Sequence, residues 1–195
     1  MMKQIIILAF WVNGFLSCGQ ISQEKKVIDE PAVYELISYI LTTKEPVDFT
    51  TCDKIAETTI GNFTIANEDT LNVQSIDTLF TKEDKEYLLE QFNQASSFRI
   101  KKDSLNSKTI IPWDTFQALR KKDENARDFW THYESKYGAG CFCSIDLPMF
   151  SKDKLTAIVT ISRNCGSLNG YGGTYIYRKT KGKWIMVKAL NTWIS

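Results

Sequence analysis

The amino-acid sequence predicts an α+β domain in which helices come first and an antiparallel sheet comes last. Apolar residues recur at helical spacing in three segments before Gly140, whereas apolar and polar residues alternate in four segments after it. The links between the alternating segments are short, which favours antiparallel neighbours. We therefore expect N-terminal helices packed on a C-terminal four-stranded antiparallel meander.

The first helix is expected to begin at Asp29-Glu30-Pro31, where an acidic cap is followed by a proline in the first turn. The apolar residues that follow recur at i, i+3, i+4, i+7 and i+8 and so share one face; they are Val33, Leu36, Ile37, Ile40 and Leu41. We expect this helix to end near Thr43, before Pro46.

Residues 47–80 have a weaker pattern, in which apolar residues at 60–65 and 71–76 suggest one or two short strands. The next segment, residues 81–84, resembles a capping box and predicts a helix that continues through Ala95. Its buried side is expected to consist of Leu88, Leu89 and Phe92.

A third helical region is expected after a polar loop at 101–108. It starts at Pro112 or Asp114 and extends to Tyr137, and the polar residues 121–125 are a candidate break. Its second half is aromatic, and Gly138 and Gly140 mark its end.

The alternating segments predict strands at Cys143–Phe150, Leu155–Arg163, Thr174–Lys179 and Trp184–Thr192. Turn residues separate them at 152–153, 166–173 and 181–182. The glycine-rich segment 166–173 is interpreted as a wide hairpin loop, because the residues that follow it do not begin a helix as a phosphate-binding loop requires. Since glycine lets a partner approach the backbone closely, the candidate binding residues are Gly166, Gly170, Tyr171, Gly172 and Gly173.

Residues 1–20 resemble the export signal of bacterial lipoproteins. Lys3 gives a positive start, Ile5–Val12 is a short apolar run, and Phe15-Leu16-Ser17 precede Cys18. The apolar run of about eight residues is too short to span a bilayer. The resemblance implies a cleaved signal peptide over 1–17, with lipid and acyl chains such as palmitate on Cys18. An ordinary signal peptide that contains a cysteine is the alternative.

The resemblance also sets the expected domain organisation and location. Residues 18–28 would be a lipidated polar tether, and residues 29–195 a single domain with the membrane as its partner. Gly19 is not the aspartate that retains lipoproteins in the inner membrane of enteric bacteria. We therefore expect a place in the cell envelope, at the periplasmic face of the outer membrane.

Charge and histidine content exclude several function classes. The chain has 24 basic residues, of which Lys3 falls in the signal, against 23 acidic ones. This balance gives no electrostatic basis for binding nucleic acid. His132 is the single histidine, which removes most histidine-based metal and triad chemistry, and no cofactor is indicated. The carboxylates of Glu134, Asp146 and Asp153 have no neighbour at a spacing that implies paired acid and base groups.

The remaining cysteines, Cys52, Cys141, Cys143 and Cys165, suggest one or two disulfides in an oxidising compartment. Cys141 and Cys143 are too close in sequence to favour pairing with each other. Because Cys165 ends a neighbouring strand, Cys141–Cys165 and Cys143–Cys165 both remain open. A zinc site that includes His132, or a Cys165–His132 catalytic dyad, is the sharper alternative.

Residues 142–195 resemble the C-terminal half of small uncharacterised lipoproteins of Bacteroidota. The resemblance is carried by Pro148–Asp153, Ala157–Ser162, Cys165-Gly166, Tyr177 and Gly182-Lys183-Trp184. It implies an envelope location and no established activity. The element order is also similar to cone-shaped NTF2-like domains, in which helices pack on a curved sheet. That fold hosts enzymes and binding modules alike and so assigns no function.

Three functions are compatible with these patterns. The first is a lipid-anchored binding module that uses the glycine segment and the aromatic sheet face toward a protein or a small ligand. The second is an envelope hydrolase or transferase that uses Cys165 or a carboxylate in a sheet-lined pocket. The third is an inhibitor or immunity protein that occludes an enzyme. A carbohydrate-stacking role would require the tryptophans to line one exposed groove; they are Trp113, Trp130, Trp184 and Trp193.

Overall fold

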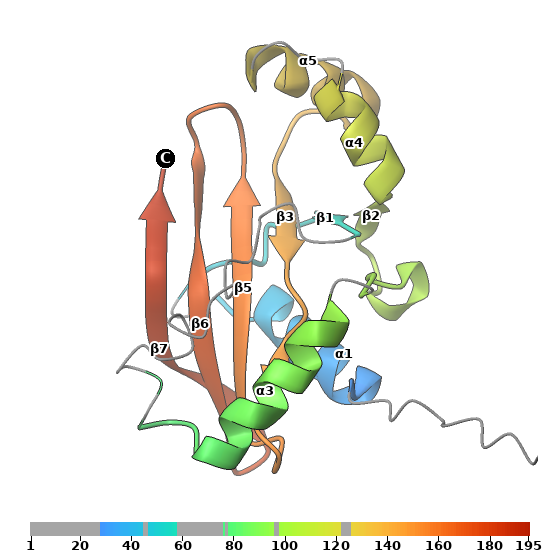
Figure 1. Ribbon diagram of the computed structural model, residues 1–195. Coiled ribbons are helices and arrows are strands. Elements are labelled where there is room, and N and C mark those ends of the chain that lie inside the picture. Colours follow the sequence, from blue (N-terminus) through green and yellow to red (C-terminus); the bar gives the residue numbers. More distant parts are fainter. Residues whose placement is uncertain (1–27, 45–46, 58–75, 77, 96–97, 122–125) are drawn as a thin grey trace, which may run out of the picture.

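The computed structural model describes residues 28–44, 47–57, 76, 78–95, 98–121 and 126–195 (Figure 1). Its helices are α1 (Glu30–Thr42), α3 (Lys82–Ala95), α4 (Trp113–Lys121) and α5 (Ala126–Tyr137), with a 3-10 helix, η1, at Lys102–Ser104. Its strands are β1 (Lys54–Ala56), β2 (Thr109–Ile111), β3 (Phe142–Ile145), β4 (Met149–Phe150), β5 (Thr156–Asn164), β6 (Gly170–Thr180) and β7 (Lys183–Ile194). The α+β class is confirmed. The expected signal peptide, Cys18 and the strands expected at 60–65 and 71–75 lie outside the described residues.

The strands form one mixed sheet in the order β2-β1-β3-β5-β6-β7, and β4 pairs with β5 beside β3. This sheet is larger than the four-stranded antiparallel one expected. Strand β1 runs parallel to β2 and to β3, whereas the other pairs are antiparallel. The strand expected over 143–150 is divided into β3 and β4. Pro148 lies between them, and proline cannot donate to a strand ladder.

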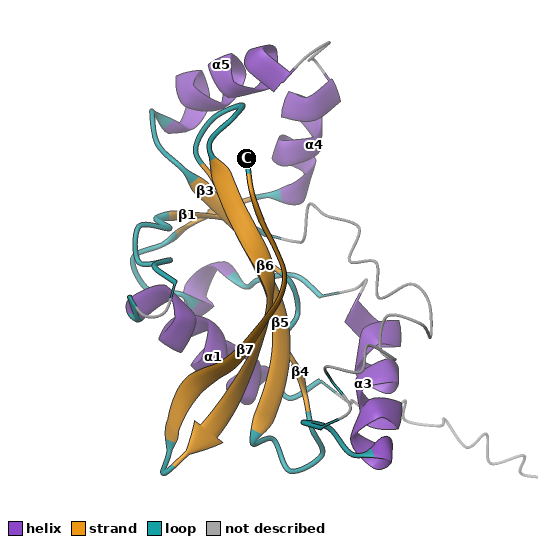
Figure 2. Cartoon of the chain, turned by 90° about the vertical axis from the view of Figure 1, so that its left-hand side faces the viewer, coloured by secondary structure: helices purple, strands orange, loops and turns teal. Residues whose placement is uncertain are grey.

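Helix α1 begins as the sequence predicts. The Asp29 side chain caps it by accepting a hydrogen bond from the Ala32 N–H at 3.4 Å, and a proline lies in the first turn. All five residues of the expected apolar face are buried. They pack against one face of the sheet, where Val159, Ile161 and Tyr175 belong to the same core cluster. Figure 2 shows α1 on one side of the long strands and α3 on the other.

Helix α3 begins with the expected capping box. The Asp84 N–H donates to Thr81 Oγ1 at 3.1 Å, and the Thr81 N–H donates to the Asp84 carboxylate at 3.0 Å. Leu88 is fully buried against Ile158 and Ile176 on the second sheet face. The other two expected core residues, Leu89 and Phe92, are only partly buried.

Helices α4 and α5 lie at the end of the sheet where β7 ends (Figure 1). They form an aromatic cluster with the start of β3, in which Phe116, Tyr133 and Phe142 are buried and Phe129 is partly buried. Gly138 has a φ of +76°, a left-handed conformation that suits a glycine after a helix. None of the helices in the described ranges is long and apolar enough to cross a membrane.

The wide hairpin loop predicted for the glycine-rich segment 166–173 is wrong for the second half of that segment. The turn is confined to residues 165–169, where the Cys165 N–H donates to the Asn169 carbonyl at 2.7 Å. Gly170, Tyr171, Gly172 and Gly173 are not in a loop but in β6, between β5 and β7. Because glycine has no side chain, residues of β5 and β7 can pack closely against β6 at the glycine positions. A Cβ on Gly172 would lie 2.8 Å from Ser162 Cβ.

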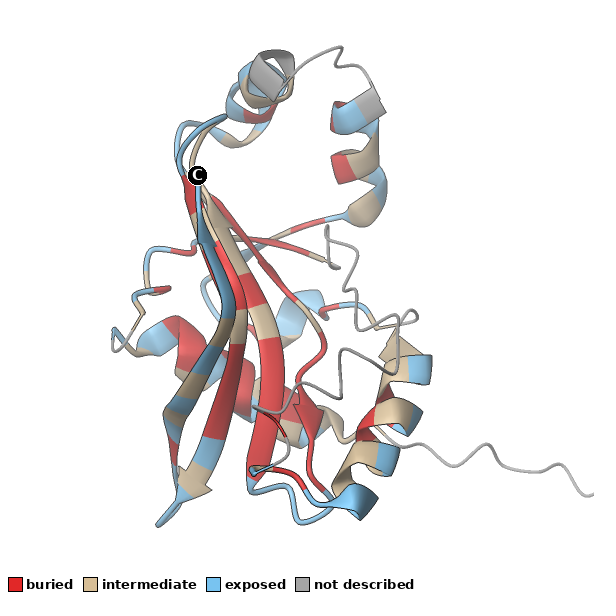
Figure 3. Cartoon of the chain, turned by 60° about the vertical axis from the view of Figure 1, so that its left-hand side comes forward, coloured by how far each residue is buried: buried red, intermediate tan, exposed pale blue. Residues whose placement is uncertain are grey.

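Strand β7 is the last strand of the sheet, and Figure 3 shows that exposed residues follow its length while the central strands are buried. Several large apolar side chains on it are exposed, namely Ile185, Val187, Trp193 and Ile194. By contrast, Trp184 at its start is buried in the core beneath α1.

Candidate functional site

One face of the sheet carries a block of polar side chains. We call it the polar patch; its members are Ser144, Asp146, Thr160, Ser162, Asn164 and Thr174. The register pairs Ser144 with Ser162 and Thr160 with Thr174. The Asp146 N–H donates to the Thr160 carbonyl at 2.9 Å, which extends the β3–β5 ladder. Since side chains alternate along strands, these residues share one face.

The polar patch lies between two apolar clusters of the same face. Toward α3, Ile158 and Ile176 are buried with Met149. Toward α4 and α5, Phe142 is buried in the aromatic cluster. On the opposite face β5 remains apolar at Val159 and Ile161. The change from apolar to polar residues is therefore local to the middle of one face.

Hydroxyl groups of the polar patch bond in pairs across the strands. Ser144 Oγ and Ser162 Oγ are 2.7 Å apart, and Thr160 Oγ1 and Thr174 Oγ1 are 2.9 Å apart. Asn164 Nδ2 donates to Ser162 Oγ at 3.2 Å. A hydroxyl has one donor and two acceptor positions, and a pair uses only one of each. Each pair therefore retains a proton and several lone pairs for another molecule.

Asp146 is the one acidic member of the polar patch. Burial raises the pKa of its carboxyl group to about 8. Among the described residues, no hydrogen bond or ion pair to this carboxyl group is found, although the chain desolvates it. The group is thus poised to gain or lose a proton near neutrality. It can donate a hydrogen bond when protonated and accept several when ionised.

Trp193 extends the polar patch onto β7. A β-bulge lies between the pairs Gly172–Trp193 and Thr174–Leu190, and Asn191 within it has a φ of +47°. The extra residue turns Trp193 to the face that Leu190 occupies. A Cβ on Gly172 would lie 2.9 Å from the Trp193 ring, so the indole lies over this glycine beside Ser162. Trp193 is nevertheless 39% exposed.

The four tryptophans do not line one exposed groove, which was the condition set for a carbohydrate-stacking role by all four. Trp184 is buried under α1, and Trp113 and Trp130 pack in the aromatic cluster. Of the four, Trp193 is the one that lies beside the residues of the polar patch. Sequence spacing could not show this, because the bulge at Asn191 decides where Trp193 points.

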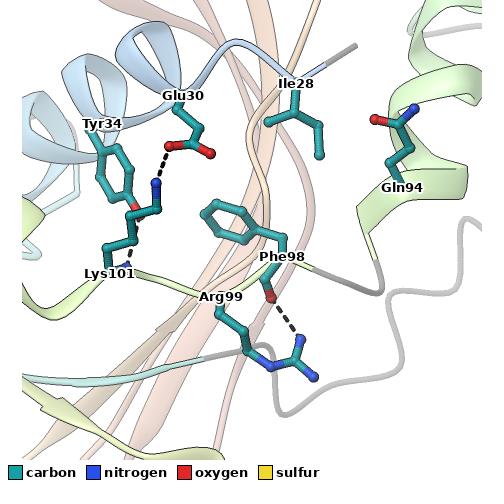
Figure 4. Close-up of a pocket in the computed structure, with 7 residues that line it drawn as sticks. All are labelled: Ile28, Glu30, Tyr34, Gln94, Phe98, Arg99 and Lys101. Carbon is teal, nitrogen blue, oxygen red and sulfur yellow. Dashed lines mark hydrogen bonds and ion pairs between the residues drawn. The ribbon is translucent and has the colours of Figure 1, made fainter. Parts of the chain in front are cut away.

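A cavity of about 410 Å³ lies apart from the polar patch, between the start of α1 and the end of α3 (Figure 4). It is lined by Ile28, Glu30, Tyr34, Gln94, Phe98, Arg99 and Lys101. Its charged groups largely satisfy one another: Lys101 forms an ion pair with Glu30, which raises the pKa of the lysine. The Lys101 N–H also donates to the Tyr34 hydroxyl at 2.8 Å. The polar patch is therefore the stronger candidate site.

The structure contains two disulfides, Cys52–Cys143 and Cys141–Cys165, so the prediction of disulfides is confirmed. Of the two pairings left open for Cys165, the one with Cys141 is found. These sulfurs are bonded to each other and cannot act as thiolate nucleophiles or zinc ligands. His132 is exposed on α5. In the described part of the chain, no group of three His, Cys, Asp or Glu residues could hold a metal ion.

Sequence reasoning missed the polar patch. Asp146 was a candidate only for paired carboxylate chemistry, and no function was predicted for the hydroxyl residues of β5. The usable signal was the alternation Thr160, Ser162 and Asn164 in a strand that is otherwise apolar. No family model matches the chain, and no curated protein or solved structure matches it either. Function is therefore inferred from the residues of the site.

Proposed function

We propose that the protein is a lipid-anchored binding module of the bacterial cell envelope that takes its ligand on the polar patch. The observation that carries the binding role is Asp146, a half-buried carboxyl group on the polar patch without a partner among the described residues. Burial of such a group costs stability, and proteins retain costs of this kind mainly at functional sites. The surrounding hydroxyl groups supply further donors and acceptors.

Two features support the envelope location. Residues 1–20 resemble a lipoprotein export signal that ends at Cys18. The two disulfides fit an oxidising compartment, since such bonds are rare where thiols are kept reduced. We place the protein at the periplasmic face of the outer membrane, held by lipid on Cys18.

The NTF2-like arrangement is part of this proposal. Strands β3, β5, β6 and β7 are antiparallel neighbours in that order, and α1 and α3 cover their two faces. In a cone-shaped domain the ligand lies against one sheet face, which is where the polar patch is found.

A second candidate function is an envelope hydrolase or transferase. A carboxyl group with a pKa of about 8 can act as a general acid or base near neutral pH, and Asp146 meets this requirement. The two functions share one site. They differ in whether the ligand is released chemically changed, which mass spectrometry of the ligand after incubation decides.

The anchor is tested by the intact mass of the full-length chain, expressed in a bacterial host and extracted from membranes without reduction. We expect residues 18–195 with diacylglycerol and acyl groups, and thiols that resist alkylation. Cys18→Ala protein should lack the lipid and leave the membrane fraction. An unlipidated wild-type chain would refute the anchor.

The binding role is tested by NMR of the full-length protein in detergent, with extracts of the bacterial envelope as the added sample. We expect the amide signals of Thr160, Ser162 and Thr174 to shift. Asp146→Asn protein should respond less, whereas Asp114→Asn protein, changed at an exposed acid on α4, should respond as the wild type does. Shifts confined to other elements, or no shifts, would refute the polar patch as the site.

A further inference from the structure

Residues of the polar patch and Trp193 form a two-dimensional array across four strands. Ser144, Ser162, Gly172 and Trp193 are successive partners in one row. Asp146, Thr160, Thr174 and Leu190 occupy the next row on the same face. Neighbouring strands are about 4.8 Å apart, and the rows are about 7 Å apart along the strands. The outer strands of the array, β3 and β7, are therefore about 14 Å apart, so a ligand of two or more linked rings is needed to touch both rows and the indole at once.

The three kinds of group in this array have complementary roles. The Trp193 indole presents an apolar aromatic surface that is partly exposed. The hydroxyl pairs can each donate and accept further hydrogen bonds. The Asp146 carboxyl group can donate a hydrogen bond when protonated and accept several when ionised. A ligand that matches all three needs an apolar face and several hydroxyl groups at its edge.

We infer that the polar patch and Trp193 bind a neutral oligosaccharide: the apolar face of one sugar ring stacks on the indole, and hydroxyl groups of the neighbouring rings bond to Ser162, Thr160 and Asp146. This inference rests on the proposed function and names its ligand class. Aromatic side chains suit such a ligand because they offer a large apolar surface at low entropic cost.

Other ligand classes fit the array less well. An anion would meet a carboxyl group and no cationic member of the polar patch. A purely apolar ligand would cover six polar side chains without replacing their bonds to water, which costs free energy for each group left unpaired. A sugar replaces those bonds, because each of its hydroxyl groups both donates and accepts.

Gly172 has no side chain, and this is consistent with the binding of a sugar beside Trp193. Any Cβ at that position would collide with the indole at 2.9 Å and with Ser162 Cβ at 2.8 Å. The glycine thus lets Trp193 lie close to the sheet, with its ring edge next to the first hydroxyl row. The bulge at Asn191 provides the second condition by directing Trp193 to this face.

The test uses the full-length protein in detergent and three neutral tetrasaccharides: maltotetraose, cellotetraose and tetra-N-acetylchitotetraose. Binding is followed by the indole N–H signal of Trp193 and the amide signals of Thr160 and Ser162. We expect at least one tetrasaccharide to shift these signals with a dissociation constant of about 1 mM or tighter. Absence of shifts with all three would overturn the sugar assignment.

Variants test whether the sugar binds through stacking on Trp193 and hydrogen bonds to Asp146. Trp193→Ala and Asp146→Asn should each weaken binding at least about tenfold, a loss that central contacts typically show. Trp193→Phe retains a stacking surface and should lose less, and Ile194→Ala, at the exposed neighbour on β7, should bind as the wild type does. Equal affinity in the wild type and both site variants would overturn the inference.

Failure of this inference is distinguishable from failure of the proposed function. If envelope extracts shift the amide signals of the polar patch but the tetrasaccharides do not, the binding module stands and the sugar class is wrong. If the tetrasaccharides bind but the intact mass shows no lipid, the sugar site stands and the anchor is wrong.

Discussion

The side chain of Gln91 bonds both backbone groups of Phe150. Gln91 Nε2 donates to the Phe150 carbonyl at 2.8 Å, and the Phe150 N–H donates to Gln91 Oε1 at 2.9 Å. Gln91 is 3% exposed, although it lies on α3 among charged residues. The two-residue strand β4 is thereby attached to the helix that covers its face of the sheet.

Replacement of Gln91 by leucine should destabilise the protein by about 2–4 kcal/mol, because both Phe150 groups lose their partner inside the protein. Urea unfolding measures this loss. Asn93→Ala, at an exposed position two residues later, is the matched control and should change stability by about 0.5 kcal/mol or less. A similar small change in Gln91→Leu protein would contradict the role given to this side chain.

Replacement of Asp146 by asparagine should stabilise the protein increasingly as pH rises. Burial raises the pKa of Asp146 to about 8, against an ordinary value of 3.8. Between these values the folded state binds more protons than the unfolded state does, so this group's contribution to stability falls as pH rises. One pKa unit corresponds to about 1.4 kcal/mol, so we expect the advantage of Asp146→Asn to grow by several kcal/mol over that window, with about 6 kcal/mol as the upper bound.

Urea unfolding of the two proteins over this pH window measures the effect. Asp114→Asn protein, changed at an exposed carboxylate in the first turn of α4, should show no comparable trend. A constant difference between wild type and Asp146→Asn across the window would mean that Asp146 titrates normally in the folded protein.

An added methyl group at Gly172 should cost about 1–3 kcal/mol, because its Cβ would lie within 2.9 Å of the Ile161 carbonyl oxygen and of the Trp193 ring. Gly170→Ala is the matched control, since the closest atom there is at 3.2 Å. It should cost clearly less in thermal or urea unfolding. Addition of Trp193→Ala should recover only part of the Gly172→Ala loss, because the clash with the backbone remains.

Removal of the two disulfides should have unequal effects. The Cys52–Cys143 bridge joins residues 91 apart and the Cys141–Cys165 bridge residues 24 apart. Loop-closure entropy then predicts losses of about 4.5 and about 3.5 kcal/mol for the respective double alanine variants. Cys52 and Cys143 are also fully buried, which adds to the first loss. Urea unfolding of each variant, with intact mass as the check on the remaining bridge, tests the order.

The helices could be predicted well because their signals are local. The cap at Asp29 and the capping box at Thr81 both identify the first turns that the structure shows. The apolar face of α1 follows directly from its spacing. Gln91 could not be predicted as a core residue, because its partner Phe150 is 59 residues away in sequence.

The sheet and the candidate site could be predicted only in part. Strands β1 and β2 have three residues each and pair in parallel with distant segments, so little local pattern marks them. The glycines within 170–173 predicted a loop, because the sequence shows their conformational freedom. It does not show the close contact of Gly172 with Ser162 and Trp193. The polar patch depends on register between strands, which no single segment specifies.

Both disulfides end near β3, with Cys141 just before the strand and Cys143 within it, and they tie it to the segments on either side. A slip of β3 by two residues would keep each side chain on its own face, so hydrophobic burial discriminates poorly against it. Such a slip would bring Cys141 to the place of Cys143, opposite Cys52, and would leave Cys165 without a cysteine beside it. Both bridges can therefore form together only in the native register of β3, which is also the register that places Asp146 opposite Thr160.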